Sequence, residues 1–205
     1  MKQLNQLAML EGLFKNANEK INLVSRKDID NLMERHILHS LAIAKFIAFK
    51  KNTRVLDFGT GGGLPGIPLA IFFPDVQFTL CDSIEKKIRA AKEISINLGL
   101  KNIKFITGRV EQLNEKQGGQ KVHFDFILSR AVASVAQTYR WTQDYISKIN
   151  TNAIPNGYLF LKGGDLREEI SEVKKINKRM HAEEIPLSKW FGENFFETKK
   201  LLYVH

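Results

Sequence analysis

The sequence predicts an α/β fold with a mixed, mainly parallel sheet and a helical N-terminal extension. Beyond residue 52, short apolar runs typical of strands alternate with longer stretches of helical periodicity, which favours parallel strands covered by helices on both faces. Over residues 1–50, apolar side chains recur at the spacing of amphipathic helices. Because no repeat or linker separates the two parts, we expect a single domain over residues 1–205, with the extension (1–50) packed on the core (51–205).

The periodicity of apolar residues places each element in order. In the extension, one helix carries Leu7, Leu10 and Phe14 on its apolar face, and a second helix after Asp30-Asn31 carries Ile37. In the core, strands are expected near 53–58, 76–81, 103–107, 123–128 and 157–161, with a final strand at Lys200–Val204. Helices are expected near 66–73, 84–98, 133–149 and 165–179, the last with Asp165 as its candidate N-cap.

Composition limits the class of protein. The chain is 43% hydrophobic and 26% charged, which is ordinary for a soluble globular protein, and its longest apolar stretch, 64–73, is too short to span a bilayer. Cys81 is the sole cysteine, so no intrachain disulfide can form, and the first residues lack the apolar segment of a secretory signal. No cluster has metal-ligand spacing. We therefore expect a cytoplasmic protein with no metal and no membrane contact, and favour a monomer.

The charge balance favours an anionic partner. Lys and Arg number 31 against 22 Asp and Glu, which gives a net charge of +9. Neutralising phosphates releases counterions, and this release drives nonspecific binding to nucleic acid. The cations are nevertheless scattered along the chain, and many basic proteins bind no nucleic acid. Charge alone therefore leaves the presence of a nucleic-acid partner open.

The most informative segment is the glycine-rich run Asp57–Gly66, which lies between a strand and a helix. Gly59 and Gly61 allow a sharp turn and a close approach of ligand to backbone, as in nucleoside-cofactor loops. Leu64 stands where the third glycine of a dinucleotide motif would fall, which disfavours NAD. Asp57 before the glycines is typical of S-adenosylmethionine enzymes, where it could hold the loop or receive the ammonium of the cofactor. The alternative is a tight turn that binds no ligand.

Acidic residues follow the second and third strands. Asp82 lies 21 positions after Gly61, close to the separation expected for a carboxylate that binds ribose hydroxyls, although it could instead cap the next helix. Val110 and Glu111 follow the third strand and therefore reach the same edge of the sheet, where ligands bind in open α/β folds. Alternatively, Glu111 is a first-turn helix acid favoured by the helix dipole.

Polar residues also follow the fourth and fifth strands. Ser129 and Arg130 end the apolar run Phe124–Leu128 at the presumed ligand edge, so we expect Arg130 to contact a ligand or phosphate. The alternative for Arg130 is a surface ion pair. Lys162 follows the fifth strand and could meet RNA phosphate, or it could remain a solvated lysine before a Gly-Gly turn.

Taken together, these motifs resemble one known family, RsmG (GidB). The likeness covers nearly the whole chain and rests on the order and spacing of Gly59–Ala70, Asp82-Ser83, Gly108–Glu111, Ser129–Ala131 and Lys162-Gly163, with Ile21–Leu23 and Arg35–Leu38 in the extension. The resemblance implies a class I, Rossmann-like, S-adenosylmethionine-dependent methyltransferase. Its implied reaction is methylation of N7 of a guanine in 16S ribosomal RNA, either as free RNA or in a small-subunit particle.

The resemblance also implies roles for individual residues. Gly59 and Leu64 would contact S-adenosylmethionine, Val110 and Glu111 would border its adenine, and Arg130 would reach the cofactor or the RNA. Guanine N7 carries an in-plane lone pair and no proton, so its attack on the methyl group needs alignment but no general base. We therefore name no catalytic acid or base. Two other functions stay open, namely an NAD(P)-dependent Rossmann oxidoreductase and a noncatalytic ribosome-assembly protein that binds RNA.

Overall fold

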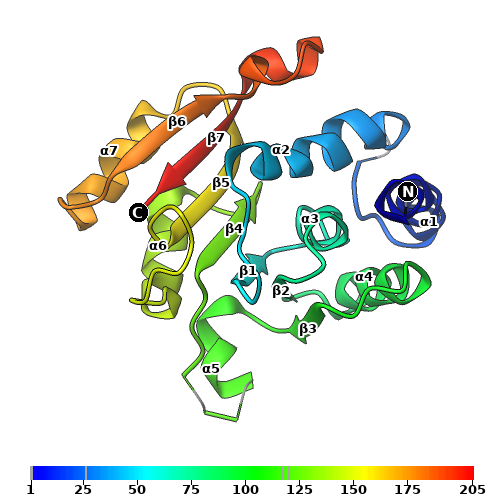
Figure 1. Cartoon of the computed structure of the whole chain (residues 1–205), viewed down its shortest axis with the longest axis horizontal. Helices are drawn as coiled ribbons and strands as arrows, with labels where there is room; N and C mark the ends of the chain where they lie inside the picture. Colours follow the sequence, from blue (N-terminus) through cyan, green and yellow to red (C-terminus); the bar gives the residue numbers. More distant parts are fainter. Residues whose placement is uncertain (1, 26, 117, 120) are drawn as a thin grey trace.

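A seven-stranded sheet forms the centre of the computed structural model, which describes residues 2–25, 27–116, 118–119 and 121–205 (Figure 1). The strand order in this described part is β3-β2-β1-β4-β5-β7-β6. The strands are β1 (Arg54–Phe58), β2 (Gln77–Asp82), β3 (Ile103–Thr107), β4 (Phe126–Arg130), β5 (Gly157–Gly163), β6 (Ala182–Pro186) and β7 (Lys199–Val204). Strands β1 to β5 pair in parallel, whereas β7 pairs antiparallel with both β5 and β6. The predicted mixed, mainly parallel sheet is confirmed.

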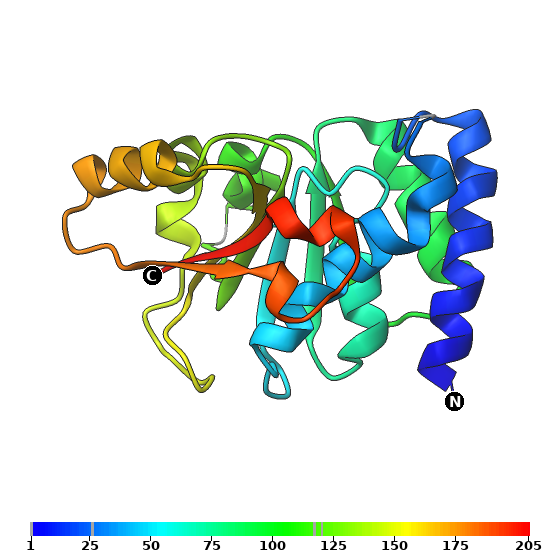
Figure 2. The ribbon, with the colours of Figure 1, turned by 90° about the horizontal axis from the view of Figure 1, so that it is seen from above.

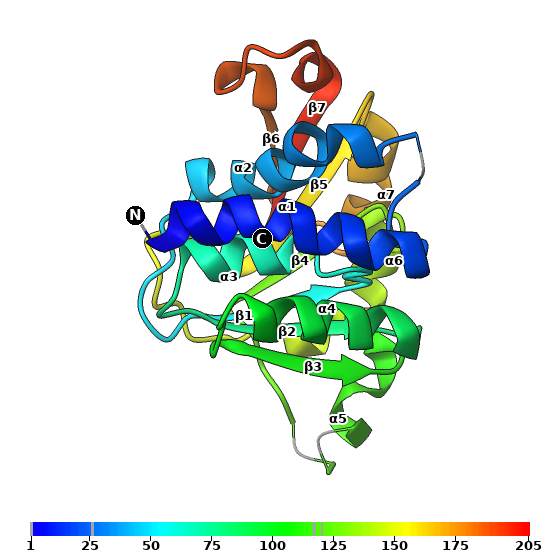
Figure 3. The same cartoon turned by 90° about the vertical axis from the view of Figure 1, so that its right-hand side faces the viewer.

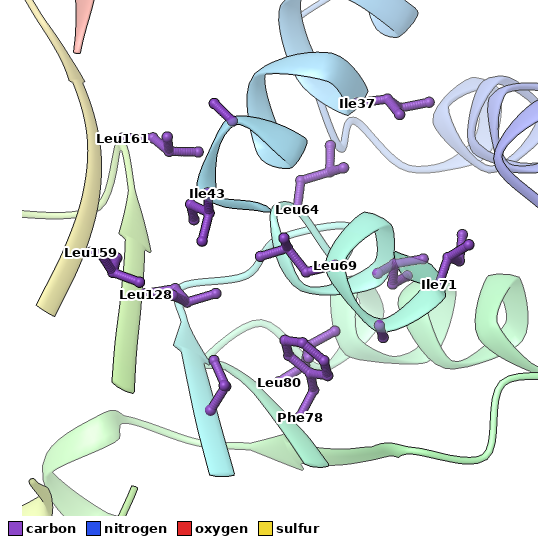
Figure 4. Packing of buried hydrophobic residues seen from close by; sticks show 14 of the residues in the cluster. Ile37, Ile43, Leu64, Leu69, Ile71, Phe78, Leu80, Leu128, Leu159 and Leu161 are labelled. Carbon is purple, nitrogen blue, oxygen red and sulfur yellow. The ribbon is translucent and has the colours of Figure 1, made fainter. Parts of the chain in front are cut away.

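Helices cover both faces of this sheet (Figure 1). One face carries α2 (His39–Phe46), α3 (Gly66–Phe72) and α4 (Glu85–Asn97), and the other carries α6 (Val135–Thr142) and α7 (Arg167–Ile176). Side chains alternate between the two cores, as the two-residue period of a strand requires. Leu128 thus belongs to the core under α2 and α3, and its neighbour Ile127 belongs to the core under α6 and α7. Figure 4 shows Ile43 and Leu69 beside Leu128 in the first of these cores.

The N-terminal extension packs on the same core as the sheet. Helix α1 (Lys2–Lys20) lies against α3 and α4 (Figure 3) and buries Leu10 and Phe14. The Gln6 amide donates a hydrogen bond of 2.7 Å to the carbonyl of Leu98, which ties α1 to the end of α4. A 3₁₀ turn (Ile29–Asn31) and a π-helix (Met33–Leu38) then lead into α2. Figure 2 shows α1 and α7 at opposite ends of the molecule.

Several predicted boundaries were wrong because tertiary contacts move them. Strand β4 begins at Phe126 and not at 123, because the Asp125 carboxylate accepts the Arg54 N–H at 2.7 Å and Phe124 forms a separate bridge with Ile146. The same bridge ends the helix predicted over 133–149, since the backbone of Tyr145 and Ser147 bonds to Phe124. Helix α6 therefore stops at Thr142, followed by a 3₁₀ turn (Gln143–Tyr145).

The C-terminal third also differs from the prediction. Helix α7 begins at Arg167 and ends at Ile176, inside the predicted 165–179, and Leu166 occupies the N-cap position expected for Asp165. The Asp165 carboxylate nevertheless accepts the backbone N–H of Arg167, the first residue of α7, at 3.0 Å, and it also pairs with the Arg167 guanidinium at 2.6 Å. Strand β6 was not predicted, because its only buried residue is Ile185 and its pattern is therefore weak. The remaining helical turns are Val110–Gln112, α5 (Leu113–Lys116), Leu187–Lys189 and Asn194–Thr198. No helix in the described ranges is long and apolar enough to cross a membrane.

Candidate functional site

The carboxyl ends of β1 and β4 form a topological switch point, because the chain leaves β1 toward β2 and leaves β4 toward β5, on the other side. Ligands of open α/β sheets bind in the crevice that such a reversal creates. The glycine loop lies there and is held to β2, since the N–H groups of Gly59 and Thr60 donate to the Cys81 carbonyl at 2.7 and 3.2 Å. Gly59 and Gly61 have φ of 65° and 57°, the left-handed region that favours glycine.

Asp57 fixes the loop from beneath. Its fully buried carboxylate oxygen Oδ2 accepts the Thr60 hydroxyl at 2.6 Å and the Gly66 N–H at 2.8 Å, so it joins the start of the loop to the start of α3. Burial raises the pKa of Asp57 to about 7. The geometry agrees with the loop-holding role predicted for this residue, and its side chain lines neither of the hollows described below.

Asp82 joins the loop to the turn that begins α4. One carboxylate oxygen accepts the Gly61 N–H and the other accepts the Ile84 N–H, both at 2.9 Å. Asp82 therefore supports the helix start, as one of the two predicted roles requires, and it also lines a hollow that a ligand could enter. Each carboxylate oxygen has more than one acceptor site, so both could accept a further donor from a ligand.

The first hollow lies between the glycine loop and the N-terminal extension and has a volume of about 520 Å³. Among the described residues, five cationic side chains line it against a single carboxylate, Asp28, so its potential favours an anionic ligand. These cations are Arg35, Lys87, Arg130, Lys162 and Lys199. At its rim, the Phe195 ring has the Lys199 ammonium 4.8 Å and the Arg35 guanidinium 5.7 Å from its centroid.

The second hollow lies on the other side of the loop and has a volume of about 430 Å³. It is lined by Asp82 at the end of β2, by Val110 and Glu111 after β3, and by the aromatic rings of Phe58 and Trp141. Gly59, Lys87 and Ala131 line both hollows, so the two spaces adjoin across the first loop glycine. Lys87 and Arg109 also line the second hollow, so the site offers an aromatic compartment of mixed charge beside a basic one.

Arg130 is a deeply placed cation at the end of β4. Burial lowers the pKa of its guanidinium to about 10, which leaves it charged at neutral pH. Its Nη1 lies 3.1 Å from Nδ1 of His36, and no carboxylate in the described residues forms a salt bridge with it. The predicted alternative, a surface ion pair, therefore does not describe Arg130.

Two other predicted residues are placed differently from Arg130. Ser129 is buried within β4 and lines neither hollow, because neighbouring residues of a strand point to opposite faces. Lys162 does line the first hollow, but its ammonium already donates to the Glu169 carboxylate at 2.8 Å and to the Ala133 carbonyl at 3.0 Å. Lys162 is thus an anchored cation and not the solvated lysine of the alternative.

Sequence reasoning missed several residues of the site. His36 was given no role at the site, yet it meets Arg130 across 94 positions of sequence. Trp141 enters the second hollow from α6, and Val132 enters it from the segment between β4 and α6. A Cβ on Gly59 would lie 2.4 Å from Cγ2 of Val132, so this side chain covers the first loop glycine. Local sequence carries no signal for such contacts.

The strand order, the loop and the switch-point site define a class I methyltransferase fold of Rossmann-like type. Similar solved structures are fibrillarin from Aeropyrum pernix with bound S-adenosyl-L-methionine (TM-score 0.57, 13% identity, 82% of this chain and 74% of that one) and an S-adenosylmethionine-dependent methyltransferase from Aquifex aeolicus (TM-score 0.58, 16% identity, 88% and 98%). At such identities these likenesses establish the fold alone.

The chain belongs to the rRNA small subunit methyltransferase G (GidB) family, whose model matches residues 3–190. Proteins called ribosomal RNA small subunit methyltransferase G are similar to it over nearly their whole length. The one from Cytophaga hutchinsonii is 48% identical over 202 residues (98% of this chain, 92% of that protein), and the one from Flavobacterium psychrophilum is 47% identical over 202 residues (98% and 90%). The predicted family and enzyme class, an rRNA methyltransferase that uses S-adenosylmethionine, are confirmed.

Proposed function

We propose that this chain transfers the methyl group of S-adenosylmethionine to N7 of a guanine in 16S ribosomal RNA. The observation that carries the proposal is the pair of adjoining hollows, one aromatic with carboxylates at the strand ends and one basic, which meet at Gly59 in a member of this family. A nucleoside cofactor suits the aromatic second hollow, and a polyanionic RNA suits the basic first hollow.

The residues of the second hollow fit the adenosine part of the cofactor. Asp82 is placed to accept the ribose hydroxyls, while Val110 and Glu111 border the adenine. Gly61 offers an open stretch of backbone, since a Cβ there would meet no protein atom within 4 Å. With Gly59 and Leu64, it forms the cradle over which the methionine part would pass.

The first hollow would receive the target guanine and the methionine end of the cofactor. When bound, S-adenosylmethionine supplies an electrophilic methyl group, and guanine N7 attacks it without a base. The task of the chain is alignment, which can supply several kcal/mol of barrier reduction. Arg130 contributes donors at the floor of the hollow, and Lys162 adds positive charge at its wall. Ser129 acts only indirectly, through the strand that carries Arg130.

The setting of the reaction follows from its substrate. We place the chain in the cytoplasm, acting as a single domain and as a monomer on 16S rRNA or on the small-subunit particle. Because N7 is a free lone pair, the transfer requires no metal. An NAD(P)-dependent oxidoreductase is not favoured, since Leu64 replaces the third dinucleotide glycine.

The purified protein is expected to methylate rRNA from a strain that lacks its gene. Small-subunit RNA, offered free and as assembled particles with labelled S-adenosylmethionine, should gain 7-methylguanosine at one position, mapped by mass spectrometry. Chelators should leave the rate unchanged. Unmodified RNA from both substrates would point to the noncatalytic assembly protein, and binding of NADH followed by fluorescence would revive the oxidoreductase.

Cofactor binding is expected to change the fluorescence of Trp141. Its indole lies at the second hollow with its ring centroid 6.4 Å from that of Phe58, so an adenine bound there would contact it. Trp141→Phe should remove the fluorescence change while calorimetry still detects binding, and Trp190→Phe serves as the matched control that keeps the change. A full signal in Trp141→Phe would place the adenine elsewhere.

A further inference from the structure

The segment Met33–Leu38 is a π-helix, a rare conformation that concentrates at functional sites. The backbone N–H of His39 donates to the Glu34 carbonyl, five residues earlier, as a π-turn requires. The Ser40 hydroxyl donates to the carbonyl of His36 at 2.5 Å, and the His39 N–H donates to the same carbonyl. This turn carries His36 to the wall of the first hollow.

The contact between His36 and Arg130 fixes the chemical state of the histidine. A guanidinium can only donate, so the Nδ1 atom that lies 3.1 Å from Arg130 Nη1 must accept, and the ring proton must be on Nε2. Burial, followed by the charge of Arg130, lowers the pKa of His36 to about 4. Arg35 acts in the same direction and Asp28 in the opposite one. His36 is therefore a neutral acceptor at physiological pH.

Arg130 keeps donors free after this contact. A guanidinium has five N–H donors in one plane, and the contact with His36 uses one of them. A buried cation without a salt bridge in the described residues is electrostatically incomplete, and an acceptor oxygen of a ligand would complete it. The carboxylate of the methionine part and O6 of guanine both offer such an oxygen, and O6 can be bound while N7 stays free.

We propose that His36 is a positioning residue whose Nδ1 lone pair orients the Arg130 guanidinium, so that its remaining N–H groups meet an acceptor oxygen of the cofactor or the target guanine. The proposal rests on the proposed function of the site. It assigns no contact between His36 and the reacting atoms. It differs from a packing role because it requires an acceptor at one position of the side chain and not merely a filled volume.

Three variants separate positioning from packing. His36→Leu fills the space without an acceptor, His36→Asn keeps an amide oxygen near the position of Nδ1, and His181→Leu alters an exposed histidine elsewhere. Calorimetry with S-adenosylhomocysteine and steady-state methylation of rRNA are compared with thermal unfolding. We expect His36→Leu to lose about tenfold in cofactor affinity, or in kcat/KM for RNA, and His36→Asn to recover most of it.

The two assays identify which oxygen Arg130 meets. A loss of cofactor affinity assigns the carboxylate, and a loss confined to the RNA step assigns guanine O6. In the free protein, nitrogen NMR shifts of His36 should report a neutral ring protonated on Nε2. Equal function of His36→Leu and wild type, or no recovery in His36→Asn at unchanged stability, would overturn the proposal. Inactivity of the wild type toward RNA would instead contradict the proposed function. The role of His36 would then still be tested by cofactor binding.

Discussion

A Gly59→Asp variant is expected to lose more than about a hundredfold in affinity for S-adenosylmethionine while it still folds. Gly59 has φ of 65°, where a non-glycine residue costs roughly 1–2 kcal/mol. Its Cβ would also lie 2.4 Å from Cγ2 of Val132, so either the loop or the segment after β4 must move. Because Val132 is 41% exposed, this movement costs the core little. Calorimetry with the cofactor, beside a thermal melt, measures both effects.

Gly99→Asp is the matched control for this variant. Gly99 has φ of 67° just after α4, and a Cβ there would meet no atom within 4 Å, so the backbone penalty is the same and the cofactor site is untouched. Gly61→Ala is a more specific test of ligand contact, because the added Cβ would meet no protein atom within 4 Å and could touch only a bound ligand. Weak binding in Gly59→Asp and Gly61→Ala, with normal binding in Gly99→Asp, assigns the loop to the cofactor. Normal binding in all three variants would remove that assignment.

The parts of the site that sequence could predict are those fixed by local chain geometry. The glycine loop, Asp82 and Glu111 each follow a strand directly, and parallel strands bring their carboxyl ends to one edge of the sheet. Their positions therefore follow from strand order alone. The family likeness added the nature of the reaction, which no single one of these residues specifies.

The parts that could not be predicted depend on contacts between distant segments. His36 reaches Arg130 only through a π-turn, and no pattern of apolar residues distinguishes a π-turn from an ordinary helix. Lys162 was predicted either to meet RNA phosphate or to be a solvated lysine, but Glu169 on α7 binds it across the turn between them. Helix α6 ends early because the following segment pairs with Phe124. In each case tertiary structure overrides the local preference.

The contribution of Asp57 to the free energy of unfolding is expected to fall as pH rises from about 4 to 7, whereas the buried histidines His36 and His39, whose pKa values are lowered, act in the opposite direction. Burial raises the pKa of the Asp57 carboxyl group from 3.8 to about 7 in the folded chain. Between these values the folded chain holds a proton that the unfolded chain has released, so this contribution to the free energy of unfolding decreases with increasing pH. The stabilisation that Asp57 contributes, about 4 kcal/mol, is fully present below pH 4 and is lost above pH 7. Urea unfolding of wild type and of Asp57→Asn across this range measures this contribution as a difference.

Asp57→Asn isolates the contribution of this one group. An amide oxygen can still accept from Thr60 and Gly66, and the amide nitrogen replaces Oδ1, which has no partner among the described residues. The variant should therefore lack this part of the pH dependence. Its free energy of unfolding should rise relative to that of wild type as pH increases toward 7. Asp165→Asn is the control, because pairing with Arg167 lowers the pKa of Asp165 to about 2, outside the window. Parallel pH curves for wild type and Asp57→Asn would mean that the carboxyl group under the glycine loop is ionised throughout, with the nearby Arg130 charge outweighing its burial.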